Sequence, residues 1–403
     1  MTILEAEKVY GEAPIFKEPR ILGDWVLWLE QRPKEKGRTT ALIRPWRQKN
    51  VSPQELTPYP INVSTKIHGY GGAPLTATLN KSDLILTWID NNDNCLWMRS
   101  WFCKEYNEKS SFFKLIPKLQ SICLSKNHNS CLAGGLIDLK KNIWIGLMEY
   151  EGADYIVSYS LEKTYQNPKV LYSSQGFIGY LVLNSKDRKL AWVEWKKTSM
   201  PWDSNELKLA KFEETENIST IVTLNSKYFG FKGKISFFNP IWSEKGELYV
   251  AEDSSGWWNI TQIKTDTNNK SITIHQNKWT IQADIAFPQW VLGMSSFSCV
   301  GDDVVGVFAQ EGIWTLALFK KNGSMQIINQ PFIDFSGLHS HQNRLVAIAS
   351  SSEISEGIFE IDLLGKSWDH TPASKFSLDP SQISIGESFW FIGSNEENVH
   401  AWY

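Results

Sequence analysis

The sequence predicts an all-β fold, a seven-bladed β-propeller of four-stranded antiparallel blades. Two observations predict it. A hairpin pattern recurs seven times at an average spacing of about 53 residues, and 19 tryptophans accompany 20 phenylalanines and 13 tyrosines in 403 residues. Aromatic side chains favour strands because they fit a pleated, half-buried surface. Four short strands in each period of this length are typical of a propeller blade.

Each copy of the hairpin has an apolar alternating run, a turn-rich connection and a second run. In chain order the copies are WVLWLEQRPKEKGRTTALIRPW from Trp25, LILTWIDNNDNCLWMRSW from Leu84, IWIGLMEYEGADYIVSYSLE from Ile143, LAWVEWKKTSMPWDSNELKLAKF from Leu190, LYVAEDSSGWWNITQIKT from Leu248, VVGVFAQEGIWTLALFKKN from Val304 and LVAIASSSEISEGIFEIDLLGK from Leu345. A further short strand precedes each copy and another usually follows it. Blades stacked around an axis bury both faces of such sheets. An elongated β-solenoid is the alternative, but its repeats are usually shorter.

In the fifth copy, Trp257 and Trp258 follow a glycine. We expect them in the turn and third strand of the fifth blade, where adjacent residues point to opposite faces. One ring should therefore pack toward each neighbouring blade. Two rings on opposite faces cannot clamp one ligand, so this pair predicts a structural role.

The composition excludes several classes of protein. The net charge is −3, with no charge blocks, which argues against a nucleic-acid partner. No signal-peptide pattern is visible, and no apolar stretch approaches the ~18 residues of a membrane-spanning helix. The five cysteines form no CxxC motif and are odd in number. Reduced thiols in the cytoplasm are therefore expected, with no membrane partner and no cofactor.

Four stretches are more specific than a generic blade. They are 62–72 (NVSTKIHGYGG), 190–210 (LAWVEWKKTSMPWDSNELKLA), 239–260 (NPIWSEKGELYVAEDSSGWWNI) and 287–297 (FPQWVLGMSSF). In this order and spacing they closely resemble the N-terminal propeller of the prolyl oligopeptidase family, near its acylaminoacyl-peptidase and dipeptidyl-peptidase-like branch. The resemblance runs from about Glu18 to the C-terminus. It implies a propeller that covers the active site of a serine peptidase and admits only short or unfolded peptides.

One residue departs from the pattern of this family. A glutamate often follows the histidine of the first motif, whereas this chain has Gly69. The missing carboxylate removes a possible contact to the peptidase domain or to a peptide amine.

The chemistry of the family resides in a C-terminal α/β-hydrolase domain, whose serine lies in a G-x-S-x-G turn. This sequence contains no such pentapeptide. The resemblance implies an N-terminal segment over 1–17, the propeller over 18–375, and the start of a missing hydrolase domain over 376–403. We therefore expect no catalytic residue in this chain. It would be a fragment, half of a split protein, or a free-standing propeller.

Five residues are candidates for contact with a hydrolase domain or with a peptide. His68 and Tyr70 lie in the glycine-rich KIHGYGG, where a structural role at the start of the second blade is the alternative. Trp202, Asp203 and Glu206 lie on the long connection within the fourth blade, where Asp203 could instead cap a turn.

Two patterns suggest metal ligands and are better explained otherwise. His339 and His341 would share one face of a strand, but no third ligand has a recognisable spacing, and the segment is interpreted as a blade turn. The stretch 90–95 (DNNDNC) lacks the glycine and the glutamate of a calcium loop, which predicts a hairpin turn. No metal is expected.

The sequence thus predicts the non-catalytic, substrate-gating propeller of a serine oligopeptidase or aminopeptidase-like protein. It would act by steric selection and water exclusion. Its partners would be an α/β-hydrolase domain, in cis or on a separate chain, and short peptides. The alternative is a stand-alone propeller that binds a protein or peptide through its loop face.

Overall fold

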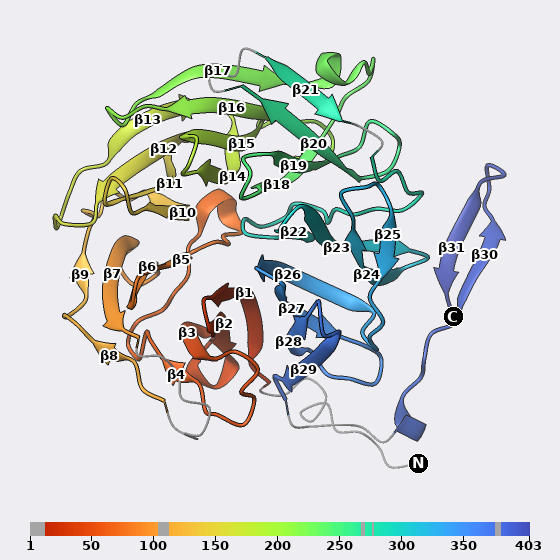
Figure 1. The fold of residues 1–403 in the computed structure, drawn as a ribbon, viewed down its shortest axis with the longest axis horizontal. Coiled ribbons are helices and arrows are strands. Elements are labelled where there is room, and N and C mark those ends of the chain that lie inside the picture. The colour runs from red at the N-terminus through yellow and green to blue at the C-terminus, as the bar shows by residue number, and fades with distance from the viewer. Residues whose placement is uncertain (1–12, 104–112, 267–270, 276–277, 375–379) are drawn as a thin grey trace.

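The computed structural model describes residues 13–103, 113–266, 271–275, 278–374 and 380–403. Over these residues, seven antiparallel sheets are arranged as blades around an axis (Figure 1), which confirms the predicted β-propeller. Each blade is built from one continuous segment of chain, with its strands paired in sequence order.

The first four blades contain β1 (Ile15–Leu22), β2 (Trp25–Arg32), β3 (Arg38–Pro45) and β4 (Gln54–Glu55); β5 (Leu75–Asn80), β6 (Asp83–Asp90), β7 (Cys95–Phe102), β8 (Ile116–Pro117) and β9 (Ile122–Cys123); β10 (Cys131–Asp138), β11 (Ile143–Tyr150), β12 (Ala153–Ser160) and β13 (Lys169–Ser174); β14 (Phe177–Asn184), β15 (Lys189–Trp195), β16 (Glu206–Phe212) and β17 (Ile218–Leu224). In the second blade, both β8 and β9 pair with β7.

The remaining blades contain β18 (Phe237–Trp242), β19 (Leu248–Glu252), β20 (Asn259–Thr265) and β21 (Ile272–His275); β22 (Phe297–Val300), β23 (Asp303–Gln310), β24 (Ile313–Phe319) and β25 (Met325–Ile327); β26 (Asp334–His341), β27 (Arg344–Ser350), β28 (Gly357–Asp362) and β29 (Ser367–Pro372). A separate hairpin, β30 (Ser388–Ile392) and β31 (Asn398–Trp402), lies beside the disc (Figure 1). The short 3-10 helices are η1 (Pro33–Glu35), η2 (Ile67–Gly69), η3 (Ser226–Phe229) and η4 (Pro380–Gln382).

The seven predicted hairpins are the two middle strands of the seven blades, from β2–β3 to β27–β28. The first strand begins at Ile15 and β29 ends at Pro372. Residues 1–12 and 375–379, which include most of the predicted N-terminal segment and the predicted end of the propeller, lie outside the described residues. The domain boundaries therefore stay predictions.

The core consists of seven apolar clusters, each between two adjacent blades. Tryptophans supply its largest buried side chains: Trp88, Trp101, Trp144 and Trp192 are at most 2% exposed. A blade presents apolar side chains on both faces, so most of the aromatic residues fill the space between blades.

The pair Trp257 and Trp258 differs from its expectation. Both residues lie in the connection before β20, where the alternation rule of a strand does not apply. Trp257 is 41% exposed. Trp258 packs against the cluster between the fifth and sixth blades. The expectation that one ring packs toward each neighbouring blade is therefore wrong for Trp257.

Among the described strands, the first and last blades exchange none, so side chains hold this seam. The buried guanidinium of Arg44 in β3 pairs with the buried carboxylate of Glu360 in β28, with 3.1 Å between Nη1 and Oε1. Nη2 of Arg44 also donates to the Thr371 hydroxyl at 3.0 Å. Nearer the surface, Arg47 Nε lies 2.7 Å from Asp369 Oδ2.

The strand order decides which connections share a face of the disc. Because neighbouring strands are antiparallel, the link between the second and third strands of a blade leaves from the same face as the link to the next blade. We name this side the connection face. The chain also reaches β1 and leaves β29 at this face.

The first strand of each blade is its innermost strand (Figure 1). Five of these seven strands, β1, β10, β14, β18 and β26, carry a bulge near the axis. Each bulge holds a residue with positive φ: Glu18 (48°), Gly134 (59°), Tyr180 (56°), Asn239 (53°) and Gly337 (63°). An extra residue in this conformation bends a strand and redirects its side chain. The three that are not glycine are held in place by side-chain hydrogen bonds.

Two of these hydrogen bonds join neighbouring blades. Glu18 Oε1 accepts the Ala73 N–H at 2.7 Å, which joins the first blade to the second. Asn239 Nδ2 donates to the Phe297 carbonyl at 3.0 Å, which joins the fifth blade to the sixth. The backbone cost of positive φ is thus offset near the axis by contacts that fix the spacing of blades.

Candidate functional site

Three of the five predicted contact residues meet in one cavity on the connection face. His68 and Tyr70 come from the link between the first and second blades, and Trp202 comes from the β15–β16 link. Gln289 and Trp290, from the link between the fifth and sixth blades, complete it. The volume of this aromatic cavity is about 240 Å³.

His68 is anchored by carboxylates of the third blade. Its Nε2 lies 2.7 Å from Asp154 Oδ2, and its backbone N–H donates to Glu149 Oε2 at 2.8 Å. Its ring stacks edge-on against Phe177 and Trp195, at centroid distances of 4.8 and 5.8 Å. The imidazole therefore forms a wall of the cavity and is already hydrogen-bonded.

Three aromatic rings from three different links lie together at the cavity. Trp290 contacts Tyr70 at 5.7 Å and Trp202 at 4.6 Å between ring centroids. Tyr70 is 67% exposed and Trp290 is 50% exposed. Exposed aromatic clusters of this kind mark interaction surfaces.

Gln289 places an unsatisfied acceptor beside these rings. The residue is 6% exposed, and its Nε2 donates to the Phe237 carbonyl at 3.0 Å. Its Oε1 is buried and has no hydrogen-bond partner among the described residues. An unpaired buried carbonyl of this kind costs about 1–3 kcal/mol, so such atoms usually have a function or a missing partner.

The other two predicted residues lie outside this cavity. Asp203 is exposed, and its backbone N–H donates to the Met200 carbonyl at 3.0 Å within the turn. Glu206 begins β16, pairs with Lys208 at 2.8 Å, and lines a neighbouring groove that shares Trp195 with the cavity.

Gly69 lies in η2 with φ of 80°, and a Cβ built there would meet nothing within 4 Å. The space for a side chain at this position is therefore open, although the backbone conformation favours glycine.

The link 287–295 separates the aromatic cavity from the axis of the propeller. Its Leu292 N–H donates to the Gly71 carbonyl at 3.1 Å, and the Tyr180 hydroxyl donates to the Val291 carbonyl at 3.1 Å. A Cβ at Gly72 would lie 2.1 Å from the Leu292 carbonyl oxygen, so only glycine permits this approach. Leu292 lines both the aromatic cavity and a second cavity at the axis.

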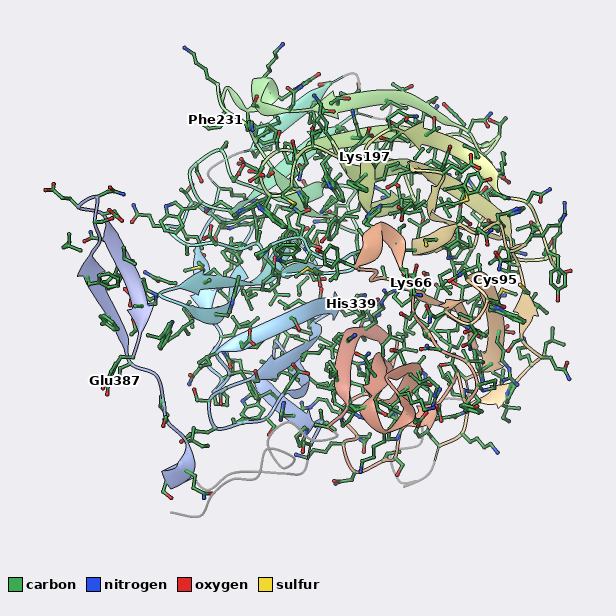
Figure 2. The ribbon with its side chains drawn as sticks, turned by 180° about the vertical axis from the view of Figure 1, so that it is seen from behind. Lys66, Cys95, Lys197, Phe231, His339 and Glu387 are labelled. Carbon is green, nitrogen blue, oxygen red and sulfur yellow. The ribbon has the colours of Figure 1, made fainter. Side chains whose placement is uncertain are left out.

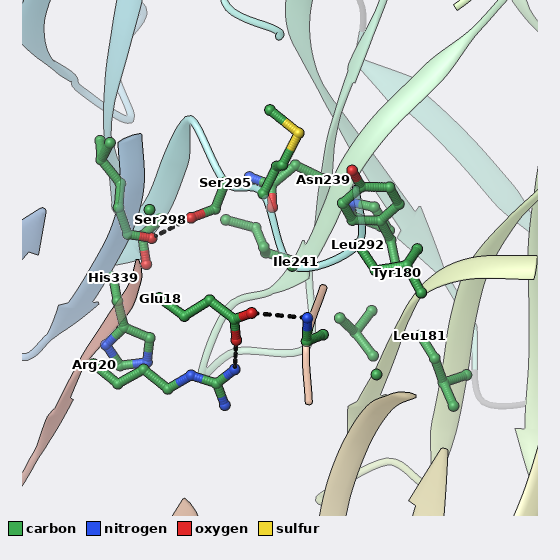
Figure 3. Close-up of a pocket in the computed structure, with 18 of the residues that line it drawn as sticks. Glu18, Arg20, Tyr180, Leu181, Asn239, Ile241, Leu292, Ser295, Ser298 and His339 are labelled. Carbon is green, nitrogen blue, oxygen red and sulfur yellow. Dashed lines mark hydrogen bonds and ion pairs between the residues drawn. The ribbon is translucent and has the colours of Figure 1, made fainter. Parts of the chain in front are cut away.

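The axial cavity, of about 270 Å³, holds the bulge residue Glu18 together with Arg20 and His339 (Figure 3). Burial raises the pKa of Glu18, while Arg20, 3.1 Å away, opposes that shift. Loss of contact with water lowers the pKa of His339 to about 3, and the charges of Arg20 and His341 act in the same direction. His339 Nδ1 accepts the Ile21 N–H at 3.2 Å and so cannot take a proton from a serine.

His339 and His341 lie within β26, not in a turn as the sequence suggested. His339 is near the centre of the disc (Figure 2). Among the described residues, no group of three His, Cys, Asp or Glu side chains could hold a metal ion. The stretch 90–95 is a hairpin turn between β6 and β7, as predicted.

One serine is hydrogen-bonded to a histidine ring at the edge of the molecule. Ser388 Oγ lies 2.8 Å from His400 Nε2 across the β30–β31 hairpin. Within the described part of the chain, no carboxylate is hydrogen-bonded to His400; Ser388 is exposed and His400 is half-buried. A Ser–His–Asp triad also needs a carboxylate that orients the histidine, so this pair is not one.

The five cysteines are free. Among the described residues, no helix has the length and apolar character that crossing a membrane requires.

Sequence reasoning missed Gln289 and Trp290, although both lie in the FPQW stretch that carries the resemblance. A signal was present, because this stretch falls outside the repeated hairpins. Conspicuous side chains in a connection point to function more often than those in a strand.

Comparison with models of protein families gives no match, and comparison with curated proteins gives none either. Solved structures do match. A puromycin hydrolase is 19% identical, with a TM-score of 0.80 over 96% of this chain and 58% of its own. A puromycin-hydrolyzing peptidase of Mycobacterium tuberculosis is 20% identical, with a TM-score of 0.82 over 99% of this chain and 60% of its own.

A more distant match is prolyl oligopeptidase B from Galerina marginata, bound to a 35mer hydrolysis and macrocyclization substrate. It is 12% identical, with a TM-score of 0.63 over 98% of this chain and 56% of its own. This chain therefore spans somewhat over half the length of these proteins. The likeness predicted from the four motifs is confirmed at the level of fold.

Proposed function

We propose that this chain is the non-catalytic, substrate-gating propeller of a serine peptidase of the prolyl oligopeptidase type. The observation that carries the proposal is the extent of the fold match. Nearly all of this chain superimposes on puromycin-hydrolyzing peptidases, whereas about two fifths of each of those chains has no counterpart here. Peptide hydrolysis would reside in an α/β-hydrolase domain, in cis or on a separate chain.

The connection face is the side on which this domain would dock. The chain reaches β1 and leaves β29 at this face, so a domain joined to either end starts from it. The exposed rings of Tyr70 and Trp290 lie on the same face. Docking would cover them and exclude water from a peptide held between the two halves.

The β30–β31 hairpin supports the same proposal. Phe389 and Phe391 lie on one of its faces, and Trp390 and Trp402 on the other, and all four are 43–53% exposed. A two-stranded hairpin is marginally stable alone, and one with two apolar faces needs cover on both. Glu387, just before β30, exchanges backbone hydrogen bonds with Tyr403, just after β31. Figure 2 shows this end of the hairpin beside the disc. We propose that it belongs to the sheet of the hydrolase domain.

Gating would be steric. Leu292 and its link lie between the aromatic cavity and the axis, so the axial route is constricted on the connection face. The disc would cover the space between the two halves and keep folded proteins out of it, while short peptides would enter. We place the protein in a reducing compartment such as the cytoplasm, because its cysteines are free.

A fluorophosphonate probe tests the absence of catalysis. The isolated chain should not react, because the proposal places the activated serine in the hydrolase domain. Labelling that disappears when one of its serines is replaced would contradict the proposal.

Docking is tested by reading the DNA beyond the Tyr403 codon and the neighbouring genes for a hydrolase with G-x-S-x-G, and expressing it with this chain. A one-to-one complex that cleaves short peptides supports the proposal. If no such hydrolase binds, a stand-alone peptide-binding propeller is the better description.

A further inference from the structure

We infer that the aromatic cavity is a subsite for one large neutral side chain of a peptide, preferably aromatic, whose backbone N–H is accepted by Gln289 Oε1. This inference rests on the proposed function insofar as peptides reach the connection face. It assigns the ligand chemistry of that face, which the fold match leaves open.

The size of the cavity limits the occupant to a side chain. Sites that enclose a whole small molecule usually have volumes of ~300–1,000 Å³. The aromatic cavity, at about 240 Å³, is smaller than that range. It can hold one large side chain while the rest of the ligand stays outside.

The lining favours an apolar and aromatic group. Rings of Tyr70, Phe177, Trp195, Trp202 and Trp290 surround the cavity. Aromatic pairs in edge or offset contact add stabilisation beyond the burial of their area. A ring inserted here could contact several partners at once.

The charged and apolar side chains that line the cavity disfavour an ionic occupant. Lys197 lines the cavity, and its ammonium group donates to the Gly152 carbonyl. A ligand cation would be repelled by this charge, although aromatic rings alone could attract one. An inserted carboxylate would lose its hydration against apolar rings. A neutral side chain meets neither penalty.

Gln289 supplies the polar contact. The hydrogen bond from Nε2 to the Phe237 carbonyl fixes the orientation of the amide, because the flipped amide would place two acceptors together. Oε1 is then an acceptor, and it has no partner among the described residues. A peptide N–H is a neutral donor that matches it.

Access to Oε1 requires movement at the cavity mouth, because the atom itself has no contact with solvent. Met200 is 49% exposed, so its side chain has room to turn outward while the Trp290 ring stays packed against Tyr70 and Trp202. The ligand ring would then fill the cavity, and its backbone N–H would reach Oε1. A peptide that offers both the ring and the N–H would be selected.

The test uses the full chain of residues 1–403 and the blocked tripeptide acetyl-Ala-Phe-Ala-amide, titrated by calorimetry and by ligand-observed NMR. We expect this peptide to bind at least about tenfold more tightly than those with Ala, Glu or Lys in the centre. Equal binding of the Phe and Ala peptides, or no binding of the Phe peptide at 10 mM, would overturn the inference.

The hydrogen bond to Gln289 is tested on the ligand, which leaves the protein unchanged. N-methylation of the Phe amide should weaken binding about 2- to 13-fold, the equivalent of a hydrogen bond of 0.5–1.5 kcal/mol. In Gln289→Leu the methylated and unmethylated peptides should bind alike. An N-methyl effect of the same size in both proteins would place the N–H elsewhere.

Trp290→Ala should weaken the Phe peptide at least about fivefold. Trp257→Ala, which removes a similarly exposed indole from another link, is the matched control and should leave binding unchanged. Equal losses in both variants would refute the subsite. Circular dichroism confirms that each variant is folded.

The outcome is separable from that of the proposed function. The peptides are titrated into this chain without a hydrolase, so failure here removes the subsite without affecting the test of hydrolase docking. Conversely, Phe-dependent binding by a chain that docks no hydrolase would retain the subsite and remove the gating role.

Discussion

Replacing Glu360 tests whether one buried ion pair holds the ring closed. The side chains of Arg44 and Glu360 are 1% and 0% exposed, and they join the first blade to the last. Glu360 Oε1 accepts from Arg44 Nη1 at 3.1 Å and from the Arg47 N–H at 2.7 Å, and Oε2 accepts from Arg44 Nη2. Glu360→Gln keeps the size of the side chain but removes its charge and turns an NH₂ group toward a donor.

The expected cost follows from the charge that remains. Removing one partner of a buried pair leaves the other unpaired and typically costs about 3–5 kcal/mol. Arg44 keeps its bonds to Thr371 and to the Pro45 carbonyl and its position over the Trp28 ring, but these do not neutralise it. We expect the free energy of unfolding of Glu360→Gln to fall by about 3 kcal/mol or more.

The assay is urea unfolding at pH 7, followed by circular dichroism. The double variant Arg44→Met/Glu360→Leu should recover most of the loss, because replacing both charges by apolar groups is often neutral. Asp302→Asn, which breaks the surface pairs with Lys245 and Lys321, is the matched control and should not change the midpoint resolvably. A loss below about 1 kcal/mol in Glu360→Gln would refute the reasoning, since that is the scale of an exposed pair.

Three further predictions concern the axis and the connection face. The pKa of His339 is about 3 when folded and 6.5 when unfolded, so its contribution to stability is lost as the pH falls from 6.5 toward 3. His339→Asn, which keeps an acceptor for the Ile21 N–H, should flatten the plot of urea midpoint against pH in that window, and an unchanged slope would contradict this assignment. Trp202→Ala should cost no more than about 1.5 kcal/mol in urea unfolding yet weaken docking of a hydrolase half, whereas a large loss of stability would make Trp202 a core residue. Tyr180→Phe should cost about 0.5–1.5 kcal/mol through loss of the bond to the Val291 carbonyl, and an unchanged midpoint would show that this bond contributes nothing.

The connection face shows where sequence reasoning succeeded in part. His68, Tyr70 and Trp202 were singled out as contact residues, and the structure brings them to one cavity. They are 134 residues apart at most in the chain, and only the direction of the strands places their links on one side of the disc. Asp203 shares a link with Trp202 but lies outside the cavity, because neighbouring residues of a turn point in different directions. Glu206, expected on the same link, is the first residue of β16 and also lies outside the cavity.

The sequence by itself determined the blades. Alternation of apolar residues, turn-rich connections and a regular period are local properties, so seven hairpins and a propeller could be read directly from them. Local patterns say nothing about groups that meet across the ring. Only the tertiary structure decided that Arg44 meets Glu360 and that Leu292 lies between two cavities. It also decided that the Gln289 acceptor, beside aromatic rings, has no partner among the described residues. Burial and long-range hydrogen bonds create these features, and both depend on how all seven blades pack together.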